Sequence, residues 1–167
     1  EKVSDSLSSD VVNVIPGWNG FAAIKNDGSA VYWGDSNSST QFNSVSESLQ
    51  AGVREVISNG FSFAALKEDG SAITWGKYSD IIPNGVKKIF ASEEAFAALM
   101  SDGSVKAWGR DDAGGDSSSV GEDLKSGVVD IASNSWAFAA LKDDGSIVSW
   151  GRESAGGNMG EHTELLK

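Results

Sequence analysis

The stretch FAALKDDGSIVSWG at residues 138–151 decides the fold of this chain, because three close copies of it occur upstream. They read FAAIKNDGSAVYWG at 21–34, FAALKEDGSAITWG at 63–76 and FAALMSDGSVKAWG at 96–109. All four align without gaps. A self-similar segment that recurs along a chain is the signature of a repeat architecture, in which each copy is one supersecondary unit.

Each copy has the pattern of a β-hairpin with one further strand before it. The preceding runs are short and rich in Val and Ile, which is typical of strands: 11–15, 53–57, 86–90 and 128–132. The apolar spacing does not match a helix. Asp-Gly predicts a tight type I′ turn with positive φ at both central residues, and the turn glycines are Gly28, Gly70, Gly103 and Gly145. Each repeat is therefore predicted to be an antiparallel meander of three strands, with a fourth to be sought in the connector.

The tryptophan of each Trp-Gly pair is expected to be structural. These residues occupy identical repeat positions: Trp33, Trp75, Trp108 and Trp150. Period-2 alternation places Ala64 with Leu66 on one face of a strand, and the small alanine leaves room for a large indole from a neighbour. Burial of one indole removes about 200 Å² from water, worth roughly 5 kcal/mol before entropy. The three-residue spacing from Val105 to Trp108 breaks strict alternation and predicts a bulge or a strong twist in the returning strand.

The composition narrows the classes of partner. The chain has 167 residues, 20 glycines, no cysteine and a net charge of −11, with a pI near 4.4. Phosphate backbones attract Lys and Arg, so nucleic acid is not an expected partner. The absence of cysteine rules out disulfides and thiolate chemistry. No apolar run is long enough to span a membrane, so no membrane insertion is expected.

The sequence contains no recognisable catalytic or metal-binding motif. One histidine, His162, and no cysteine leave little material for a catalytic triad or a zinc site. We therefore expect no enzyme activity, no cofactor and no metal. The acidic stretch DDAGGD fits neither an EF-hand nor a nonapeptide calcium repeat, and Glu93-Glu94 is expected to be a solvated turn.

Candidate contacts with a ligand lie outside the repeated core. Trp18 and Trp136 occupy equivalent turns before two of the copies, and Asp111, Asp112 and Asp116 lie in a connector. The Asp-Gly turns should project from one end of the strands, and the connectors after Trp-Gly should leave from the other. Variable loops on a rigid scaffold are where binding usually occurs. These five residues are therefore the candidate ligand contacts.

The repeated core resembles the regulator-of-chromosome-condensation repeat family, which shares the pattern A-L-x-x-D-G-x-V-x-x-W-G. The form FAALKDDGS-x-x-x-WG is similar to the shorter bacterial version, found in large secreted or surface proteins. The resemblance implies an all-β fold, a β-propeller or propeller fragment of four antiparallel blades. Family propellers usually have more and longer blades. The insertion that exchange factors of the family use on their small GTPase is not recognisable here.

The repeats also predict the organisation of the chain. We expect a single repeat domain over 1–167, with repeats near 3–44, 45–85, 86–119 and 120–161 and a tail at 162–167 that begins the next repeat. Val3–Leu7 (VSDSL) matches Val45–Leu49 (VSESL), and His162–Leu166 occupies the same place after Trp150. The chain thus starts and stops at the same phase, as expected of a piece of a longer array or of a chain that joins a second copy. Self-association that completes the propeller is therefore expected.

These observations favour a non-catalytic binding scaffold, with a protein or a glycan as the partner. An extracellular or cell-surface location is favoured over the cytoplasm. Two alternatives stay open: a regulatory propeller that promotes guanine-nucleotide exchange, by analogy with the family, and a purely structural spacer.

Overall fold

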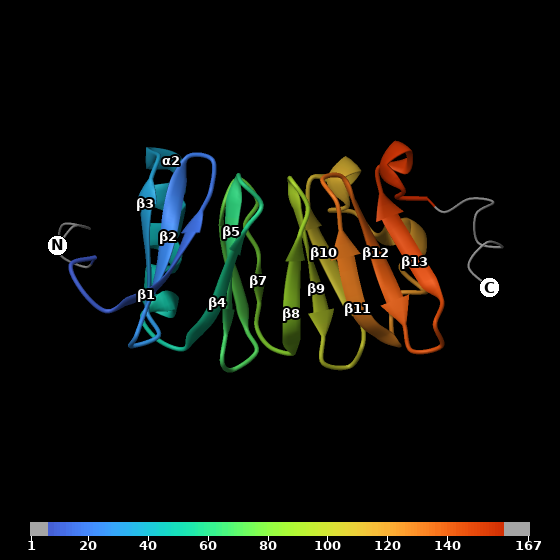
Figure 1. Ribbon diagram of the computed structural model, residues 1–167, viewed down its shortest axis with the longest axis horizontal. Coiled ribbons are helices and arrows are strands. Elements are labelled where there is room, and N and C mark those ends of the chain that lie inside the picture. The colour runs from blue at the N-terminus through green and yellow to red at the C-terminus, as the bar shows by residue number, and fades with distance from the viewer. Residues whose placement is uncertain (1–6, 159–167) are drawn as a thin grey trace. The chain divides into compact units, whose positions relative to one another are not determined.

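The computed structural model describes residues 7–158, which form four antiparallel sheets in two compact halves, divided between residues 84 and 85 (Figure 1). The predicted tail at 162–167 and most of Val3–Leu7 lie outside the described residues. Within the described part, no helix combines the length and the hydropathy that crossing a bilayer requires.

The N-terminal half contains two sheets. In the first, the strand order is β1 (Val11–Pro16), β2 (Gly20–Lys25) and β3 (Ala30–Gly34). In the second, the order is β4 (Val53–Ser58), β5 (Ser62–Lys67), β6 (Ala72–Gly76) and β7 (Ile81–Ile82). The short strand β7 lies in the connector after Trp75, where a fourth strand was sought.

The C-terminal half repeats this arrangement with three strands in each sheet. One sheet contains β8 (Val86–Ala91), β9 (Ala95–Met100) and β10 (Val105–Gly109). The other contains β11 (Val128–Ser133), β12 (Ala137–Lys142) and β13 (Ile147–Gly151). In both, the second strand lies between the first and the third, so each repeat is a meander as predicted.

The two sheets of each half pack face to face, with small side chains of the first sheet against aromatic side chains of the second. In the N-terminal half, Ala22 and Ile24 of β2 share a buried cluster with Val56, Phe63 and Trp75 of the second sheet. The Phe63 and Trp75 rings lie opposite each other on neighbouring strands, with centroids 5.4 Å apart and planes 8° apart. The small side chains of one sheet thus accommodate the stacked rings of the next.

The same packing recurs in the C-terminal half. Ala97 and Leu99 of β9 share a cluster with Ile131, Phe138 and Trp150. Phe138 and Trp150 are 1% exposed each, and their centroids lie 5.3 Å apart. Of the other repeat tryptophans, Trp75 and Trp108 are buried and Trp33 is half-buried.

The predicted type I′ hairpin turn is wrong. Only the glycine of each Asp-Gly pair has positive φ, for example +76° at Gly28, and Asp27 does not. The N–H of Gly28 donates to the carbonyl of Lys25, and the N–H of Lys25 donates to that of Ser29. This is the longer hairpin loop in which an ordinary type I turn is followed by a glycine in the left-handed region. The aspartate keeps negative φ because its side chain caps the turn instead.

The returning strand β10 has no bulge, so of the bulge or strong twist predicted there, the bulge is wrong. Val105 and Trp108 lie in continuous register with β9. The register shifts occur earlier in each repeat, between the first and second strands, at Val11/Asn13, Val53/Glu55, Val86/Lys88 and Val128/Asp130.

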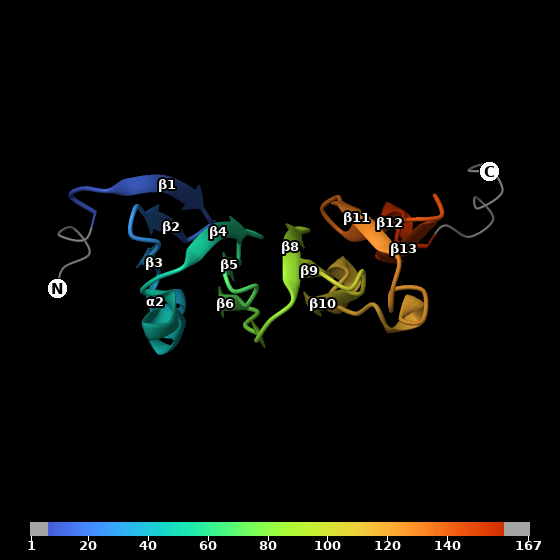
Figure 2. The same cartoon turned by 90° about the horizontal axis from the view of Figure 1, so that it is seen from below.

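Short helices form in the connectors after Trp33, Trp108 and Trp150. The first contains α2 (Ser36–Val45) and a 3₁₀ turn at Ser46–Leu49, and α2 packs beside β3 and β6 (Figure 2). Ser, Asn and Thr are poor helix formers, so the sequence did not predict α2. It forms because the Asp35 side chain caps its first turn and Phe42 is buried against the core. The later connectors contain 3₁₀ turns at Asp111–Ala113, Ser118–Val120 and Glu153–Ala155.

Candidate functional site

Trp18 is an exposed aromatic side chain in the turn between β1 and β2. Its indole is 63% exposed, and its ring lies against Phe61 with centroids 4.4 Å apart. Its backbone N–H donates to the carbonyl of Gly60 at 2.9 Å, which ties the turn to the next sheet. The indole is therefore held in place while most of its surface faces solvent.

A cavity of about 190 Å³ lies beside this aromatic pair in the N-terminal half. Aromatic and polar side chains line it together: Asn19, Tyr32, Asp35, Asn37, Ser38, Phe61, Phe63 and Lys77. The ammonium of Lys77 lies 4.9 Å from the centre of the Phe61 ring. Concave sites that combine aromatic walls with a few fixed polar groups are the usual form of a binding pocket. We call Trp18, Phe61, Lys77 and the cavity the Trp18 site.

The polar wall of the Trp18 site is preorganised by the start of α2. Asp35 accepts hydrogen bonds from the backbone N–H groups of Asn37 and Ser38, both at 3.0 Å. The bond from Ser38 is the main cause that lowers the pKa of Asp35. Burial raises the pKa of Tyr32, whose hydroxyl donates to Asp35 at 3.3 Å. The wall thus offers a neutral phenol beside an ionised carboxylate.

Trp136 occupies the equivalent turn in the C-terminal half, but arginines cover it. The guanidinium of Arg152 lies 3.6 Å from the centre of its ring, and that of Arg110 lies 5.5 Å away. The backbone carbonyl of Trp136 accepts from the N–H of Arg152 at 2.9 Å. Cations over an indole face are attracted by its quadrupole, so Trp136 is part of an internal contact.

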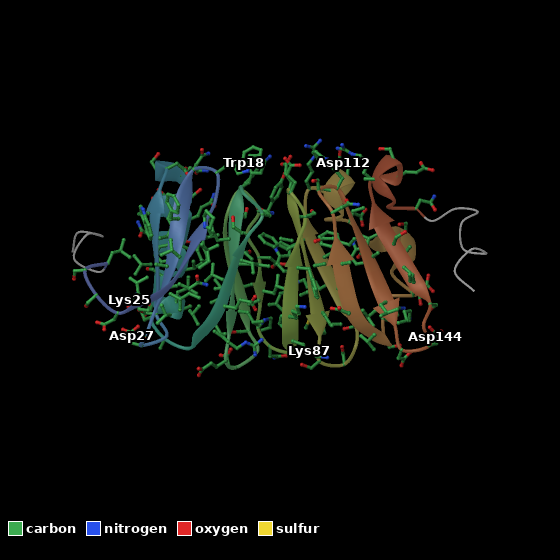
Figure 3. The ribbon with its side chains drawn as sticks, in the orientation of Figure 1. Trp18, Lys25, Asp27, Lys87, Asp112 and Asp144 are labelled. Atoms are coloured by element: carbon green, nitrogen blue, oxygen red, sulfur yellow. The ribbon has the colours of Figure 1, made fainter. Side chains whose placement is uncertain are left out.

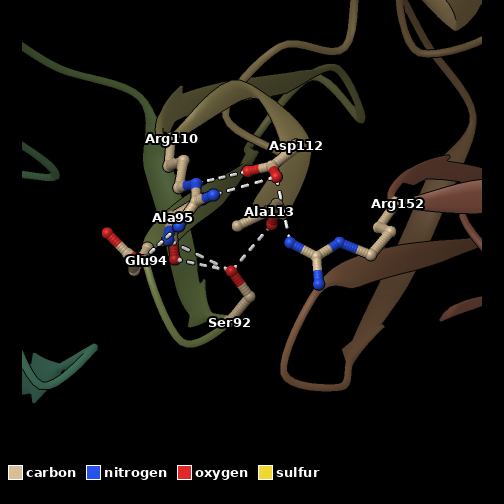
Figure 4. A network of polar contacts seen from close by, with 7 residues as sticks. All are labelled: Ser92, Glu94, Ala95, Arg110, Asp112, Ala113 and Arg152. Atoms are coloured by element: carbon tan, nitrogen blue, oxygen red, sulfur yellow. Dashed lines mark hydrogen bonds and ion pairs between the residues drawn. The ribbon is translucent and has the colours of Figure 1, made fainter.

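Acidic side chains on two elements hold these arginines (Figure 4). Asp112 pairs with Arg110 Nε at 2.5 Å and with Arg152 Nη2 at 2.9 Å. Arg110 Nη1 also donates to Glu94 at 2.8 Å. The hydrogen bond from Arg152 is the main cause that lowers the pKa of Asp112. We call Trp136, Glu94, Arg110, Asp112 and Arg152 the arginine clamp.

The three connector aspartates do not converge on one point. Asp112 is engaged by two arginines, and Asp116 accepts from the backbone N–H of Ser118 at 2.8 Å, which also lowers its pKa. Asp111 lies in the 3₁₀ turn. Within residues 7–158, no group of three or more acidic or histidine side chains is arranged to hold a metal ion.

Sequence reasoning missed most of the arginine clamp. The expectation that Glu94 is simply solvated is wrong, because its side chain is buried and paired with Arg110. The available signal was the arginine that follows Trp-Gly in two repeats, Arg110 and Arg152. Arg110 pairs with Glu94 16 residues away and Arg152 pairs with Asp112 40 residues away, so these two pairs could not be predicted from the sequence.

In each half, the hairpin tips and the connectors lie at opposite ends of the strands (Figure 3). In the N-terminal half, Trp18 lies at the connector end and Asp27 at the tip end. In the C-terminal half, Asp112 and Asp144 are separated in the same way. The tip aspartates serve the turns: Asp27 accepts from the N–H and the hydroxyl of Ser29 at 2.9 and 2.6 Å.

Comparison with known proteins supports the fold through structure alone. No protein-family model matches the sequence, and no curated protein matches it. Among solved structures, the chain is similar to Prp20p from Saccharomyces cerevisiae, reported with its binding to Gsp1p and histones. The TM-score is 0.61 at 18% identity, over 89% of this chain and 45% of Prp20p.

Other similar structures come from proteins of different kinds. The CRINKLY WD40 ectodomain of the Arabidopsis thaliana receptor kinase ACR4 aligns with a TM-score of 0.54 at 15% identity, over 86% of this chain and 51% of that one. Human WBSCR16 aligns with a TM-score of 0.56 at 21% identity, over 83% and 46% of the two chains.

The chain spans about half the length of each of these structures. Identities this low show a common fold and no more. The prediction of an all-β fold with four antiparallel blades is confirmed by the four sheets and by these propeller neighbours. The fold of this chain is thus that of propeller blades, similar to those of yeast Prp20p.

Proposed function

We propose that the chain is a non-catalytic interaction scaffold that contacts its partner through the Trp18 site. The observation that carries the proposal is an indole 63% exposed, held on Phe61, at the edge of a polar and aromatic cavity. Aromatic residues are enriched among the side chains that dominate binding energy at interfaces. The arginine clamp is less suited to this role, because its charges are already paired with one another.

The solved neighbours support a protein partner. Yeast RCC1 (Prp20) has been crystallised with Kap60, and Prp20p has been studied for its binding to Gsp1p and histones. A glycan is the second partner class, because sugar rings stack on exposed indoles while carboxylates and amides bind their hydroxyls. The net charge of −11 disfavours nucleic acid.

A secreted or surface location is part of the proposal. It is supported by the resemblance to bacterial surface repeats and by the receptor ectodomains among the neighbours. Self-association is also part of it, because joined copies would multiply the binding sites.

The test applies labelled wild-type chain, Trp18→Ala and Trp18→Phe to arrays of glycans and of extracellular and intracellular protein domains. We expect a ligand that binds wild type and Trp18→Phe, and that binds Trp18→Ala at least about tenfold more weakly, the cost of losing one stacked aromatic contact. Glu122→Gln, an exposed change in the C-terminal half, is the control. A ligand that binds Trp18→Ala as tightly as wild type contradicts the proposed site.

The two alternatives make different predictions. A regulatory propeller would accelerate nucleotide release from a small GTPase, which fluorescent-nucleotide release measures directly. A structural spacer would bind nothing on either array. Faster nucleotide release, or no binding at all, would replace the proposal by one of these.

A further inference from the structure

The sheets of this chain pack through two complementary surfaces, an aromatic face on one sheet and an alanine face on its neighbour. In each half, the second sheet presents an aromatic face, which is Val56, Phe63 and Trp75 in the N-terminal half. The first sheet presents an alanine face, which is Ala97 and Leu99 in the C-terminal half. Each sheet has both faces, because side chains alternate across a strand. Each half therefore leaves the aromatic face of its first sheet and the alanine face of its second sheet outside this contact.

In the N-terminal half, the aromatic face of the first sheet, β1–β3, is exposed. Val14 is 49% exposed and Phe21 is 44% exposed, while Trp33 is half-buried. The equivalent residues of the second sheet, Val56, Phe63 and Trp75, are 4%, 2% and 0% exposed. Phe21 and Trp33 nevertheless stack as the buried pairs do, with centroids 5.5 Å apart and planes 20° apart. The face is thus built for packing.

In the C-terminal half, the alanine face of the last sheet, β11–β13, is exposed. Leu141 is 43% exposed, whereas its equivalent Leu99 is 2% exposed. A mostly apolar groove of about 270 Å³ runs along this sheet, lined by Ile131, Ala132, Ala139, Leu141 and Ile147 among others. On the preceding sheet, the equivalent surface beside Leu99 is covered by Phe138 and Trp150.

A hydrogen bond from an indole also joins the two sheets of the C-terminal half. Within the C-terminal half, Trp150 Nε1 donates to the carbonyl of Gly114 at 2.9 Å. A Cβ on Gly114 would lie 2.5 Å from the Phe138 ring, so the glycine is needed for this contact. The last connector has the same Arg-x-x-Ala-Gly-Gly sequence at 152–157 and a similar φ at Gly156, +88° against +94°. A Cβ on Gly156 would meet nothing within 4 Å.

A backbone hydrogen bond also joins the hairpin tip of one sheet to the first strand of the next sheet in each half. The N–H of Val53 donates to the carbonyl of Gly28 at 2.8 Å, and that of Val128 donates to Gly103 at 2.9 Å. Gly145 is the equivalent tip of the last sheet, and a Cβ there would meet nothing within 4 Å. The equivalent donor on the first sheet is the N–H of Val11.

We infer that a second copy of this chain docks its β1–β3 sheet onto the β11–β13 sheet of the first. Phe21, Val14 and Trp33 would fill the groove beside Leu141 as Phe138, Ile131 and Trp150 fill the one beside Leu99. The two faces differ, so the contact is head to tail and yields a closed ring or a growing chain. This names the surfaces for the self-association included in the proposed function and does not depend on the Trp18 site.

The experiment measures molar mass by light scattering over a range of concentrations for wild type, Phe21→Asp and Leu141→Asp. We expect wild type to be a dimer or larger and each variant to be a monomer, because each places a charge in every contact. An equimolar mixture of the two variants should regain dimer, since one of its contacts combines an intact Phe21 with an intact Leu141. Ile81→Asp, at an exposed residue on β7, is the matched control and should associate as wild type does.

The mixture also shows that both variants are folded, because an unfolded chain restores nothing. A wild type that stays monomeric at high concentration overturns the inference. Equal loss of association in Ile81→Asp and Phe21→Asp also overturns it, as does a mixture that stays monomeric. None of these results depends on ligand binding, so they are distinct from a failure of the Trp18 site.

Discussion

At the residue scale, the hairpin aspartates show how one side chain fixes a local conformation. Each accepts two bonds from the serine two residues later, and the side-chain bond from that serine is the main cause that lowers its pKa. The four are Asp27, Asp69, Asp102 and Asp144. The ionised form is thus favoured in the folded chain, and the acidic tips have a structural role.

This linkage predicts how stability depends on pH. A carboxyl with a lowered folded pKa stabilises the fold above its ordinary value of 3.8, and this contribution is lost as pH falls through the folded pKa. A variant with asparagine at all four tips should have a lower urea midpoint than wild type at pH 7, and the difference should shrink towards pH 3. The measurement is urea unfolding at several pH values.

The charge-matched control for this experiment has glutamine at four exposed glutamates: Glu47, Glu55, Glu122 and Glu153. It changes the net charge equally without touching a tip. If the difference between wild type and the control shrinks towards pH 3 to the same extent, the effect comes from overall charge, and the tip explanation fails.

A second residue-scale prediction concerns Gly114. Alanine there combines left-handed backbone, which costs about 1–2 kcal/mol, with a Cβ 2.5 Å from the Phe138 ring. Overpacking adds roughly 1–3 kcal/mol. We expect Gly114→Ala to lower the free energy of unfolding by about 2–5 kcal/mol in urea titrations, the sum of these terms.

Gly121 is the matched control in the same connector, because its φ is −57°. Gly121→Ala should leave stability unchanged or raise it by about 0.4–1 kcal/mol, since alanine restricts the unfolded chain. Equal effects of the two substitutions would show that Phe138 does not pack on Gly114.

At the element scale, the sequence predicted the strands better than the connectors. The Val-Ile runs and the Asp-Gly signals act over a few residues, so all four meanders could be placed. The helix α2 could not be placed, because it depends on the Asp35 cap and on burial of Phe42 against distant strands. The predicted turn type is wrong because the aspartate side chain accepts hydrogen bonds from the serine two residues later, and this capping competes with the type I′ preference of Asp-Gly.

The candidate site shows the same division between local and distant signals. Trp18 was singled out as an aromatic residue outside the repeated core, but nothing in the chain shows that Phe61 and Lys77 lie beside it. Trp136 was singled out for the same reason, and Arg152 covers it. Two tryptophans in equivalent turns thus differ because of partners that come from other loops.

The arginine clamp gives an element-scale prediction. Arg152→Ala removes a cation over Trp136 and a tie between the 3₁₀ turn at Asp111–Ala113 and β13. An exposed cation–π contact is worth about 0.5–1 kcal/mol. Hydrogen exchange at residues 110–115 and 134–137 should therefore become severalfold faster, as measured by mass spectrometry.

Arg152→Lys should restore part of the protection, because it keeps the charge but not the planar guanidinium. Lys125→Ala breaks an exposed pair with Glu122 and should leave these segments unchanged. Wild-type exchange rates in Arg152→Ala would mean that the clamp does not hold the connector.

At the scale of the whole molecule, the central claim is directional packing. The stacked rings of one sheet lie on the small side chains of the sheet before it, in both halves. This places Trp75 and Trp150 inside and leaves Trp18 exposed in its turn. The four-sheet fold could be predicted from the sequence because a tryptophan occupies the same position in all four repeats. Tryptophans in loops, such as Trp18, do not recur in this way.

Hydrogen exchange of the six indole N–H groups, followed by two-dimensional NMR of the unmodified chain, tests this claim most directly. We predict slow exchange for the buried indoles of Trp75, Trp108 and Trp150, with Trp150 further protected by its bond to Gly114. Trp18 should exchange rapidly. Rapid exchange of all six indoles would contradict the packing of these sheets.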